Sequence, residues 1–206
     1  MGVFYNLSLS IVRGYFKLFF KVEAEGLENI SDLSPDDRVL ITPNHLSLLD
    51  PPVLGATLPI KMGYMAKAEL FKIPVFGSLI RALGAFPVNR GGGNGIAAIK
   101  TAIRLLQEGK RLIMFPEGTR AKTPGILGEG KPGAVMIALK AKAYILPIGI
   151  ESKYKIGGRI KIRIGKLINL SEYYDVKTTG EDLKKITDEV LMPEIAKLAG
   201  AKPYGN

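Results

Sequence analysis

The chain has no cysteine among its 206 residues, and it has a single histidine, His45. Without cysteine, the protein cannot form disulfides, zinc sites with thiolate ligands or iron–sulfur clusters, and it cannot use a thiol nucleophile. With one histidine, it cannot build a metal site from two imidazoles of the same chain. We therefore expect no metal centre, and imidazole proton transfer near neutral pH has one candidate.

A long hydrophobic run is also missing. The longest stretch without a charged residue is Met1–Val12, twelve residues, whereas a membrane-spanning helix needs roughly 18 or more. Arg13 and Lys17 then interrupt the apolar sequence, which is not typical of a cleaved signal peptide. We expect neither a spanning helix nor a secretory leader.

Acidic residues are few relative to basic ones, with 19 Asp and Glu against 29 Lys and Arg and a net charge of +10. This excess favours an anionic partner: nucleic acid, a membrane surface, a phosphorylated substrate or an acidic protein. Apolar residues make up 47% and charged residues 23% of the chain, which is the balance of a globular protein. The length predicts about one domain with a sizeable core.

Residues 1–20 differ from the rest of the chain, because they are rich in large apolar side chains and no acid occurs before Glu23. Basic residues recur every four positions, at 13, 17 and 21, which places them along one side of a helix. A basic, aromatic helix can lie in a bilayer interface with its charges toward anionic headgroups. The alternative is a helix packed on the core of its own domain. We predict the interfacial helix, and its membrane-binding residues are Phe4, Arg13, Phe16, Lys17 and Phe20.

Residues 21–206 alternate between strand and helix patterns, which predicts one α/β domain with a mixed sheet flanked by helices. Asp50, followed by two prolines, has the composition of a helix start. Pro193 is expected to kink the last helix. The strands are expected at 21–27, 38–42, 62–66, 85–88, 111–115, 144–150 and 160–164, and the helices at 69–83, 94–108, 134–141 and from 179 onward.

Two glycine-rich segments match nucleotide-binding motifs only in part. Residues 125–132 have the P-loop spacing until Pro132, which replaces the metal-binding Ser or Thr. Residues 91–95 precede a helix, but Ile96 stands where a dinucleotide fingerprint has its third glycine. Neither segment predicts nucleotide binding. Only the net charge supports nucleic-acid binding, since no recognised motif accompanies it, and we expect no nucleic-acid partner.

His45 and Asp50 form the first chemically informative pair. A histidine in a loop and a carboxylate five residues later, where a helix begins, are close enough for an imidazole–carboxylate hydrogen bond. Such a bond fixes the tautomer and leaves the second ring nitrogen able to take a proton from a hydroxyl. Ser47 is a rival nucleophile within the chain. The structural alternative is a histidine without catalytic use beside an Asp50 that only caps the helix.

Residues 115–120, Phe-Pro-Glu-Gly-Thr-Arg, follow an expected buried strand. Active-site loops of α/β folds lie at the ends of such strands. Arg120 is a natural clamp for a phosphate, and Glu117 can orient its guanidinium. The alternative is an ion pair on the surface.

Together these two segments resemble the glycerolipid acyltransferases, specifically the 1-acylglycerol-3-phosphate acyltransferases. The resemblance rests on Asn44-His45-x4-Asp50 paired with residues 115–120. Further blocks occur in the expected order at 84–90 (Gly-Ala-Phe-Pro-Val-Asn-Arg), 131–134 (Lys-Pro-Gly-Ala) and 145–150 (Ile-Leu-Pro-Ile-Gly-Ile). The similarity covers residues 36–150.

The resemblance implies a role for each residue of the motifs. His45 would act as the general base on the sn-2 hydroxyl of a lysophosphatidate, and Asp50 would orient it. Glu117 would position Arg120 or the glycerol, and the absence of a Cβ at Gly118 would let the backbone approach the substrate. The other expected substrate-binding residues are Arg120, Arg90 and Lys67 at the phosphate and Thr119 beside them.

The resemblance also implies partners and a location. No cofactor is expected, and the acyl donor would be acyl-CoA or an acyl carrier protein. The enzyme would lie on the cytoplasmic side of the cell membrane as a peripheral or monotopic protein. Two alternatives stay open: the same mechanism on another lysophospholipid or polar lipid, and a non-catalytic basic module that binds lipid or nucleic acid. A binding module has no use for a base aligned with a carboxylate, so the His45–Asp50 pair separates these classes.

Overall fold

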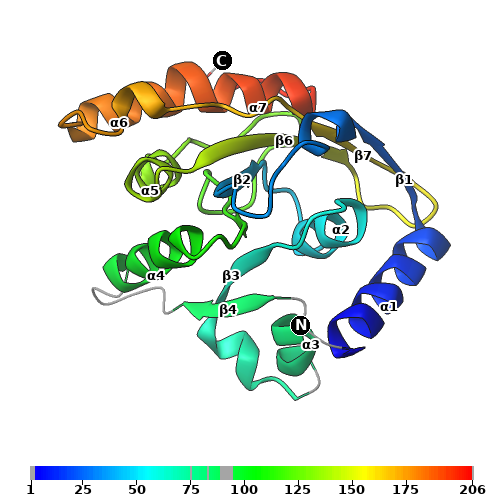
Figure 1. The fold of residues 1–206 in the computed structure, drawn as a ribbon. Helices are drawn as coiled ribbons and strands as arrows, with labels where there is room; N and C mark the ends of the chain where they lie inside the picture. The colour runs from blue at the N-terminus through cyan, green and yellow to red at the C-terminus, as the bar shows by residue number, and fades with distance from the viewer. Residues whose placement is uncertain (1–2, 75, 83, 89–94, 206) are drawn as a thin grey trace.

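A seven-stranded sheet forms the centre of the protein (Figure 1). The structure is a computed structural model and describes residues 3–74, 76–82, 84–88 and 95–205. The strands lie in the order β1-β7-β6-β2-β5-β3-β4, and all neighbours are parallel except β6 and β7. The predicted mixed sheet is therefore confirmed. The strands are β1 Lys21–Glu25, β2 Val39–Pro43, β3 Gly63–Lys67, β4 Ala85–Val88, β5 Leu112–Ile113, β6 Tyr144–Ser152 and β7 Arg159–Ile164.

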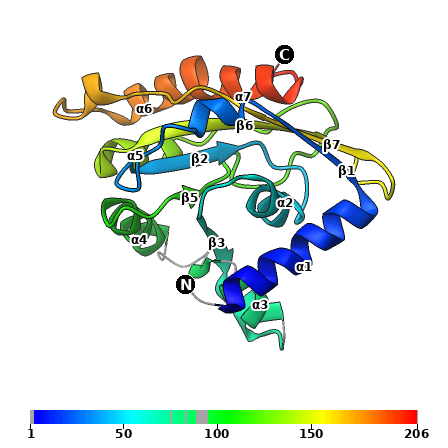
Figure 2. The same ribbon diagram turned by 45° about the vertical axis from the view of Figure 1, so that its right-hand side comes forward.

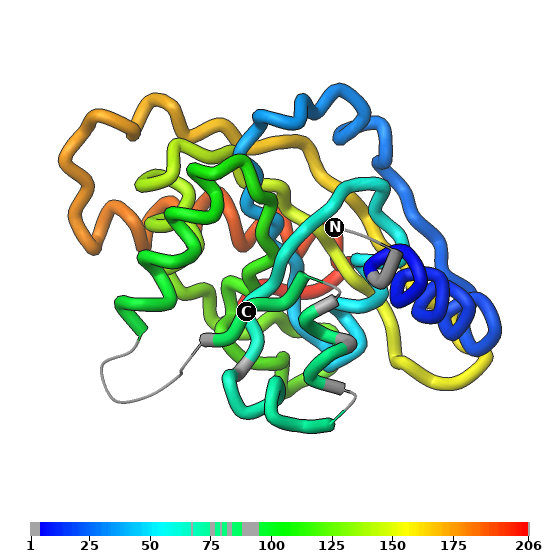
Figure 3. Tube along the Cα trace, turned by 60° about the horizontal axis from the view of Figure 1, so that its bottom comes forward, coloured from blue at the N-terminus to red at the C-terminus, as the bar shows by residue number. Residues whose placement is uncertain are grey.

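Helices cover both faces of the sheet. Figure 2 shows α1 and α2 on one side and α4 to α7 on the other. Seen from below in Figure 3, α1 lies at one side of the molecule and α4 at the other. The helices are α1 Val3–Phe19, α2 Asp50–Thr57, α3 Phe76–Ala82, α4 Gly95–Gln107, α5 Gly133–Ala141, α6 Gly180–Ile186 and α7 Met192–Ala199. Shorter helical turns are η1 Leu27–Ile30, η2 Ala68–Lys72 and η3 Ser171–Tyr173, and η4 Thr187–Leu191 is a π-helical turn.

The central strand β2 buries both of its faces, and its successive side chains point to opposite sides of the sheet. On β2, Leu40 belongs to the core under α4, α5 and α7. Its neighbour Ile41 belongs to the core under α1 and α2. All five residues of β2 are buried, so this central strand is a rigid support for whatever follows Pro43.

Several predicted elements need correction. The predicted helix 69–83 is instead the turn η2 followed by α3, because Pro74 interrupts the helical run. The predicted strand 111–115 shrinks to the two residues of β5. By contrast, the predicted start of the last helix at Thr179 is confirmed, and the side chains of Thr179 and Asp182 form a capping box there. Around Pro193 that helix has the π-helical turn η4 followed by α7.

The prediction that Phe16 and Phe20 bind a membrane is wrong. Their side chains are only 3% and 7% exposed and pack in the core under α2. The sequence misled here because α1 is apolar on two sides. A different row, Leu7, Ile11, Tyr15 and Leu18, is 55%, 60%, 42% and 76% exposed.

The two basic residues of α1 have different environments. Arg13 is tied to α2, since its Nε donates to the carbonyl oxygen of Ala56 at 3.0 Å, whereas Lys17 is exposed. The side chain of Phe4 lies outside the described residues. Within the part of the chain that the structure describes, no helix is both long and apolar enough to cross a membrane.

Candidate active site

The two sequence motifs meet at one edge of the sheet. β2 and β5 are parallel neighbours, so the loops that follow their carboxyl ends leave the sheet side by side. The backbone N–H of His45 donates to Oε1 of Glu117 at 2.7 Å. In return, the N–H of Ala121 donates to the carbonyl oxygen of His45 at 2.8 Å. The structure thus brings together segments 72 residues apart in sequence, as the resemblance implied by giving both motifs roles in one reaction.

His45 and Asp50 form a hydrogen-bonded pair. Nδ1 of His45 lies 2.7 Å from Oδ2 of Asp50, whose side chain is fully buried. The imidazole stacks on the ring of Phe115 with 3.9 Å between ring centroids. The same Oδ2 accepts the N–H groups of Leu46 and Ser47 at 2.7 and 2.8 Å. Asp50 therefore closes the turn before α2 and also holds the imidazole of His45. The two alternatives considered for Asp50, a structural role at the helix start and the orientation of the histidine, are thus both present.

The second nitrogen of the imidazole is available for chemistry. The His45 side chain is 15% exposed, and no residue in the described part of the chain hydrogen-bonds to its Nε2. The Oγ of Ser47 instead accepts the N–H of Leu49 at 3.2 Å. With Nδ1 facing a carboxylate and Nε2 open, the ring is arranged as a base for a hydroxyl supplied from outside.

Asn44 fixes the backbone immediately before the histidine. It is 1% exposed, and its amide makes two hydrogen bonds with the main chain of Ile150 on β6, at 2.9 and 2.6 Å. This side chain continues the pairing of β2 with β6 beyond Pro43. The sequence analysis included Asn44 in a motif but assigned it no role. The sequence feature that could have indicated its hydrogen bonds to β6 is the position of an asparagine directly after a buried strand.

Glu117 braces the same loop from the other side. Its carboxylate is 2% exposed and accepts two backbone N–H groups, from His45 and from Gly128 at 2.5 Å. Burial raises the pKa of Glu117 above its ordinary value, and the two N–H donors oppose that rise. Both carboxylate oxygens accept backbone N–H groups, so the prediction that Glu117 orients Arg120 is corrected: Glu117 positions the main chain of His45. The predicted alternative, that Glu117 positions the glycerol, stays a prediction.

A cationic pocket opens beside Glu117. It has a volume of about 520 Å³, and its cations are Arg120, Lys122 and Lys131. Thr119 also lines it, and Gly118 has a φ of 69°, which favours glycine. Lys131 forms an ion pair with Glu129, and its N–H donates to the carbonyl oxygen of Pro116 at 2.8 Å. The excess of positive charge suits a phosphate.

Lys67 and Arg90 stay predictions as phosphate ligands. Lys67 is the last residue of β3, a neighbour of β5, which places its backbone at the same edge of the sheet. Its side chain lies outside the described residues, as does Arg90. In the described part of the chain, no group of three or more acidic or histidine side chains could hold a metal ion.

One residue of the site was missed entirely by sequence reasoning. The hydroxyl of Tyr154 donates to Oδ1 of Asp50 at 2.5 Å. Burial raises the pKa of Tyr154, and the neighbouring Asp50 carboxylate raises it further. Tyr154 lies 104 residues from Asp50 in sequence, in a segment without a recognisable motif.

The chain is similar in sequence and in fold to known proteins. The pattern of the acyltransferase family matches residues 21–151. The 1-acyl-sn-glycerol-3-phosphate acyltransferase of Bacillus subtilis (strain 168) is 35% identical over 152 residues, which cover 70% of this chain and 74% of that protein. The chloroplastic 1-acyl-sn-glycerol-3-phosphate acyltransferase LPAT1 of Arabidopsis thaliana is 34% identical over 139 residues, covering 67% of this chain but 38% of that protein.

A solved structure resembles the whole fold. It is the 1-acyl-sn-glycerophosphate (LPA) acyltransferase PlsC from Thermotoga maritima, with a TM-score of 0.69 and 27% sequence identity. The similarity covers 94% of this chain and 81% of that one. The likeness therefore extends beyond the region that the family pattern matches.

Proposed function

The chain belongs to the acyltransferase family, and on that premise we propose that it transfers an acyl group from a thioester to the sn-2 hydroxyl of 1-acylglycerol-3-phosphate. The product is phosphatidic acid. The observation that carries this proposal is the His45–Asp50 pair, with its 2.7 Å contact and its open Nε2, next to a pocket that holds three cations.

The reaction follows from this arrangement. Nε2 of His45 takes the proton of the sn-2 hydroxyl while the oxygen attacks the thioester carbonyl. A C–O bond forms, the C–S bond breaks, and the proton passes from the imidazolium to the departing sulfur to give a free thiol. Asp50 stabilises the imidazolium between these steps. The acyl group passes directly to the acceptor, so this reaction needs no cysteine, and the chain has none.

The cationic pocket supplies recognition of the acceptor. A phosphate monoester carries close to two negative charges at neutral pH, and Arg120 can bind it in a bidentate manner while lysines bind it as point charges. Lys122 and Lys131 join Arg120 here, and Lys67 and Arg90 stay predicted as further ligands. The pocket favours a phosphate-bearing acceptor over a neutral polar lipid.

The test is release of thiol from an acyl thioester with and without lysophosphatidate. Acceptor-dependent release, absent in His45→Ala, would support the reaction and its base. Release with a lysolipid that lacks the phosphate, at the same kcat/KM, would point to another acceptor. No release with any lysolipid would leave a non-catalytic lipid-binding module as the better description.

For α1 we propose a membrane-interfacial role on the cytoplasmic side, carried by its exposed row. Leu7, Ile11, Tyr15 and Leu18 follow one another by four, four and three positions, so they share one side of the helix. The core uses the opposite side, through Phe16 and Phe20. An apolar row without cover in the fold, next to an exposed Lys17, fits an anionic bilayer surface.

A further inference from the structure

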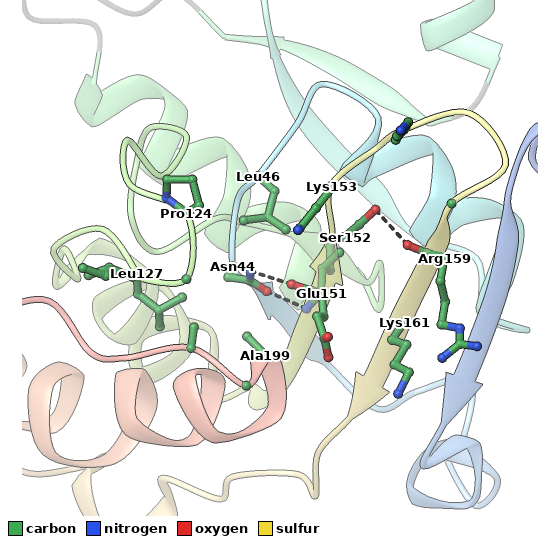
Figure 4. Close-up of a pocket in the computed structure, with 17 residues that line it drawn as sticks. Asn44, Leu46, Pro124, Leu127, Glu151, Ser152, Lys153, Arg159, Lys161 and Ala199 are labelled. Carbon is green, nitrogen blue, oxygen red and sulfur yellow. Dashed lines mark hydrogen bonds between the residues drawn. The ribbon is translucent and has the colours of Figure 1, made fainter.

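A second pocket, which we call the hairpin pocket, reaches the same edge of the sheet. It has a volume of about 540 Å³, and Asn44 and Leu46, the two neighbours of His45, line it (Figure 4). Ile126 and Leu127 line both this pocket and the cationic pocket. The two pockets thus share one segment of chain. The hairpin pocket meets the His45 loop through Asn44 and Leu46, and the cationic pocket meets it through Glu117, which accepts the His45 N–H.

One wall of the hairpin pocket is strongly basic. Lys153, Lys155, Arg159 and Lys161 line it from the ends of β6 and β7 and the turn between them, together with a single acid, Glu151. Glu151 is paired with Arg163 at 2.9 Å, and Arg159 with Glu23 at 2.9 Å. The three lysines form no ion pair within the described part of the chain. Lys161 lies opposite Glu23 on β1 and Glu151 on β6 in strand register, whereas Lys153 and Lys155 lie in the turn, so this wall carries an excess of positive charge.

The opposite wall is apolar. Figure 4 shows Pro124, Leu127 and Ala199 across from the basic residues, with Lys153 reaching toward Leu46. The pocket thus offers an apolar side for a chain of atoms and a cationic side for an anion. His45 itself lines neither pocket, but each pocket adjoins the loop that carries it, and the proposed reaction has two substrates.

We propose that the hairpin pocket binds the phosphopantetheine arm of the acyl donor, with its phosphate at Lys153, Lys155 and Lys161. This inference rests on the proposed function. The acceptor phosphate occupies the cationic pocket, so the thioester must approach His45 from another side, and the hairpin pocket adjoins both neighbours of that residue. Coenzyme A and acyl carrier protein both present this arm, so the chemistry is common to the two donors.

The test replaces the three lysines by alanine and compares donors. With acyl-CoA and with acyl carrier protein, we expect the donor KM of K153A/K155A/K161A to rise about tenfold or more, the effect of removing several contacts to one phosphate. With acyl-pantetheine, which has no phosphate, and for lysophosphatidate as acceptor, KM should stay unchanged. A matched control, K140A/K177A/K185A, removes equal charge from exposed lysines outside both pockets and should change neither KM.

Several outcomes would overturn the proposal. An equal rise with acyl-pantetheine, or a rise of the acceptor KM alone, would exclude phosphate recognition of the donor here. A rise with acyl-CoA but not with acyl carrier protein would assign the lysines to the nucleotide and not to the arm. Calorimetric titration with coenzyme A itself separates this proposal from the function: binding lost in the lysine variant supports the pocket even if no acceptor is turned over.

A second inference stands on different observations, those around Tyr154. Its backbone has a φ of 46°, which is uncommon for a residue with a Cβ. The N–H of Tyr154 donates to Oγ of Ser152 at 2.9 Å, which helps to hold this turn. The hydroxyl reaches Asp50, and the ring meets that of Phe20 edge-on, with 6.2 Å between centroids. An unfavourable backbone conformation at Tyr154 thus places its hydroxyl against the buried carboxylate of Asp50.

We infer that Tyr154 is a positioning residue for the His45–Asp50 pair and that it connects the pair to the end of α1. The groups facing the pair are Tyr154 from the β6–β7 turn and Glu117 from the loop after β5. The hydroxyl draws part of the negative charge of Asp50 away from the imidazole. It also restricts the carboxylate to the orientation in which Oδ2 meets Nδ1.

Tyr154→Phe removes this single O–H. We expect kcat to fall about 3- to 30-fold, since one hydrogen bond to a charged group is lost, with the acceptor KM unchanged. The acid limb of the kcat/KM profile should move to higher pH, because the full charge of Asp50 then holds the imidazolium proton more tightly. Tyr173→Phe, on η3 away from the site, is the control. A Tyr154→Phe enzyme with an unmoved pH profile would show that the residue only packs the turn.

Discussion

Replacing Asp50 by asparagine should separate the charge of this residue from its structural role, because the site can accommodate the amide. Three N–H groups converge on Oδ2, whereas Oδ1 has the Tyr154 hydroxyl. An asparagine oxygen at the Oδ2 position keeps all three bonds. Its NH₂ group then faces Tyr154, whose hydroxyl can rotate from donor to acceptor. We expect a loss below about 1 kcal/mol in the free energy of unfolding.

Asp50→Ala should behave differently. It leaves the N–H groups of Leu46 and Ser47 and the hydroxyl of Tyr154 without their acceptor in the interior. Each unsatisfied buried group costs about 1–3 kcal/mol, so this variant should lose several kcal/mol. Denaturant unfolding of the two variants measures the contrast, and an Asp50→Asn as unstable as Asp50→Ala would refute the rearrangement at Tyr154.

The rates should follow the charge. His45→Ala removes the only imidazole and should lower kcat by about 10²–10⁴-fold, which is about 2.7–5.5 kcal/mol in activation free energy. Asp50→Asn keeps the ring in place but not its anionic partner, so kcat should fall strongly. The acid limb of kcat/KM should move to lower pH, because a neutral amide stabilises the imidazolium less than a carboxylate does. Both variants keep Glu117, whose carboxylate accepts the backbone N–H of residue 45.

Thiol release measured from pH 5 to 9 provides the assay. The double variant should be scarcely slower than His45→Ala alone, because the two residues act as one unit. Near-normal turnover of His45→Ala, or losses that multiply in the double variant, would refute the mechanism. In that case Asp50 only caps α2.

Three further predictions concern the pocket, the helix and the buried acid. Arg120→Ala should raise the acceptor KM, and Arg120→Lys should restore it only in part because the bidentate contact is lost; equal losses with a phosphate-free acceptor would contradict the clamp. Replacing Leu7, Ile11 and Leu18 by glutamine should reduce co-sedimentation with anionic vesicles without changing the melting temperature, since these side chains are already 55–76% exposed; undiminished co-sedimentation would exclude the exposed row. Burial raises the pKa of Glu117 above 4.5, so the folded state binds its proton more tightly than the unfolded chain. The stability of the wild type relative to Glu117→Gln should therefore be greatest below pH 4.5 and decline as the pH rises through the higher folded value; denaturant titrations across this range that show the opposite trend would contradict it.

The sequence predicts the sheet well because its strands are short apolar segments bounded by turn residues. β4 occurs where it was expected, and the start of the last helix at Thr179 was readable from the capping residues. The pairing of the two motifs was predictable as well, since parallel strands present their carboxyl ends at one edge. These features depend on local sequence and on a general rule of topology.

The rest depends on contacts between distant segments. Phe16 and Phe20 could not be assigned to core or membrane from composition, because α1 has two apolar sides and only α2 decides which is covered. Glu117 carries the negative charge expected of a residue that orients an arginine. Its carboxylate instead accepts hydrogen bonds from two backbone N–H groups, which lie 72 and 11 residues away from it in sequence. Tyr154 reaches Asp50 through a turn whose left-handed backbone no local pattern indicates.

The position of β1 at the edge of the sheet has a consequence for the order of folding. β1 follows α1 directly, but its partner is β7, so Lys21 pairs with Arg159. During synthesis β1 has no neighbour in the sheet until β7, more than a hundred residues later, has been made. The helix α2, which packs against α1, comes much earlier in the chain, so the core side of α1 can be covered before the sheet is complete. The row of Leu7, Ile11, Tyr15 and Leu18 is exposed even in the finished fold, so α1 can meet a bilayer before the sheet closes.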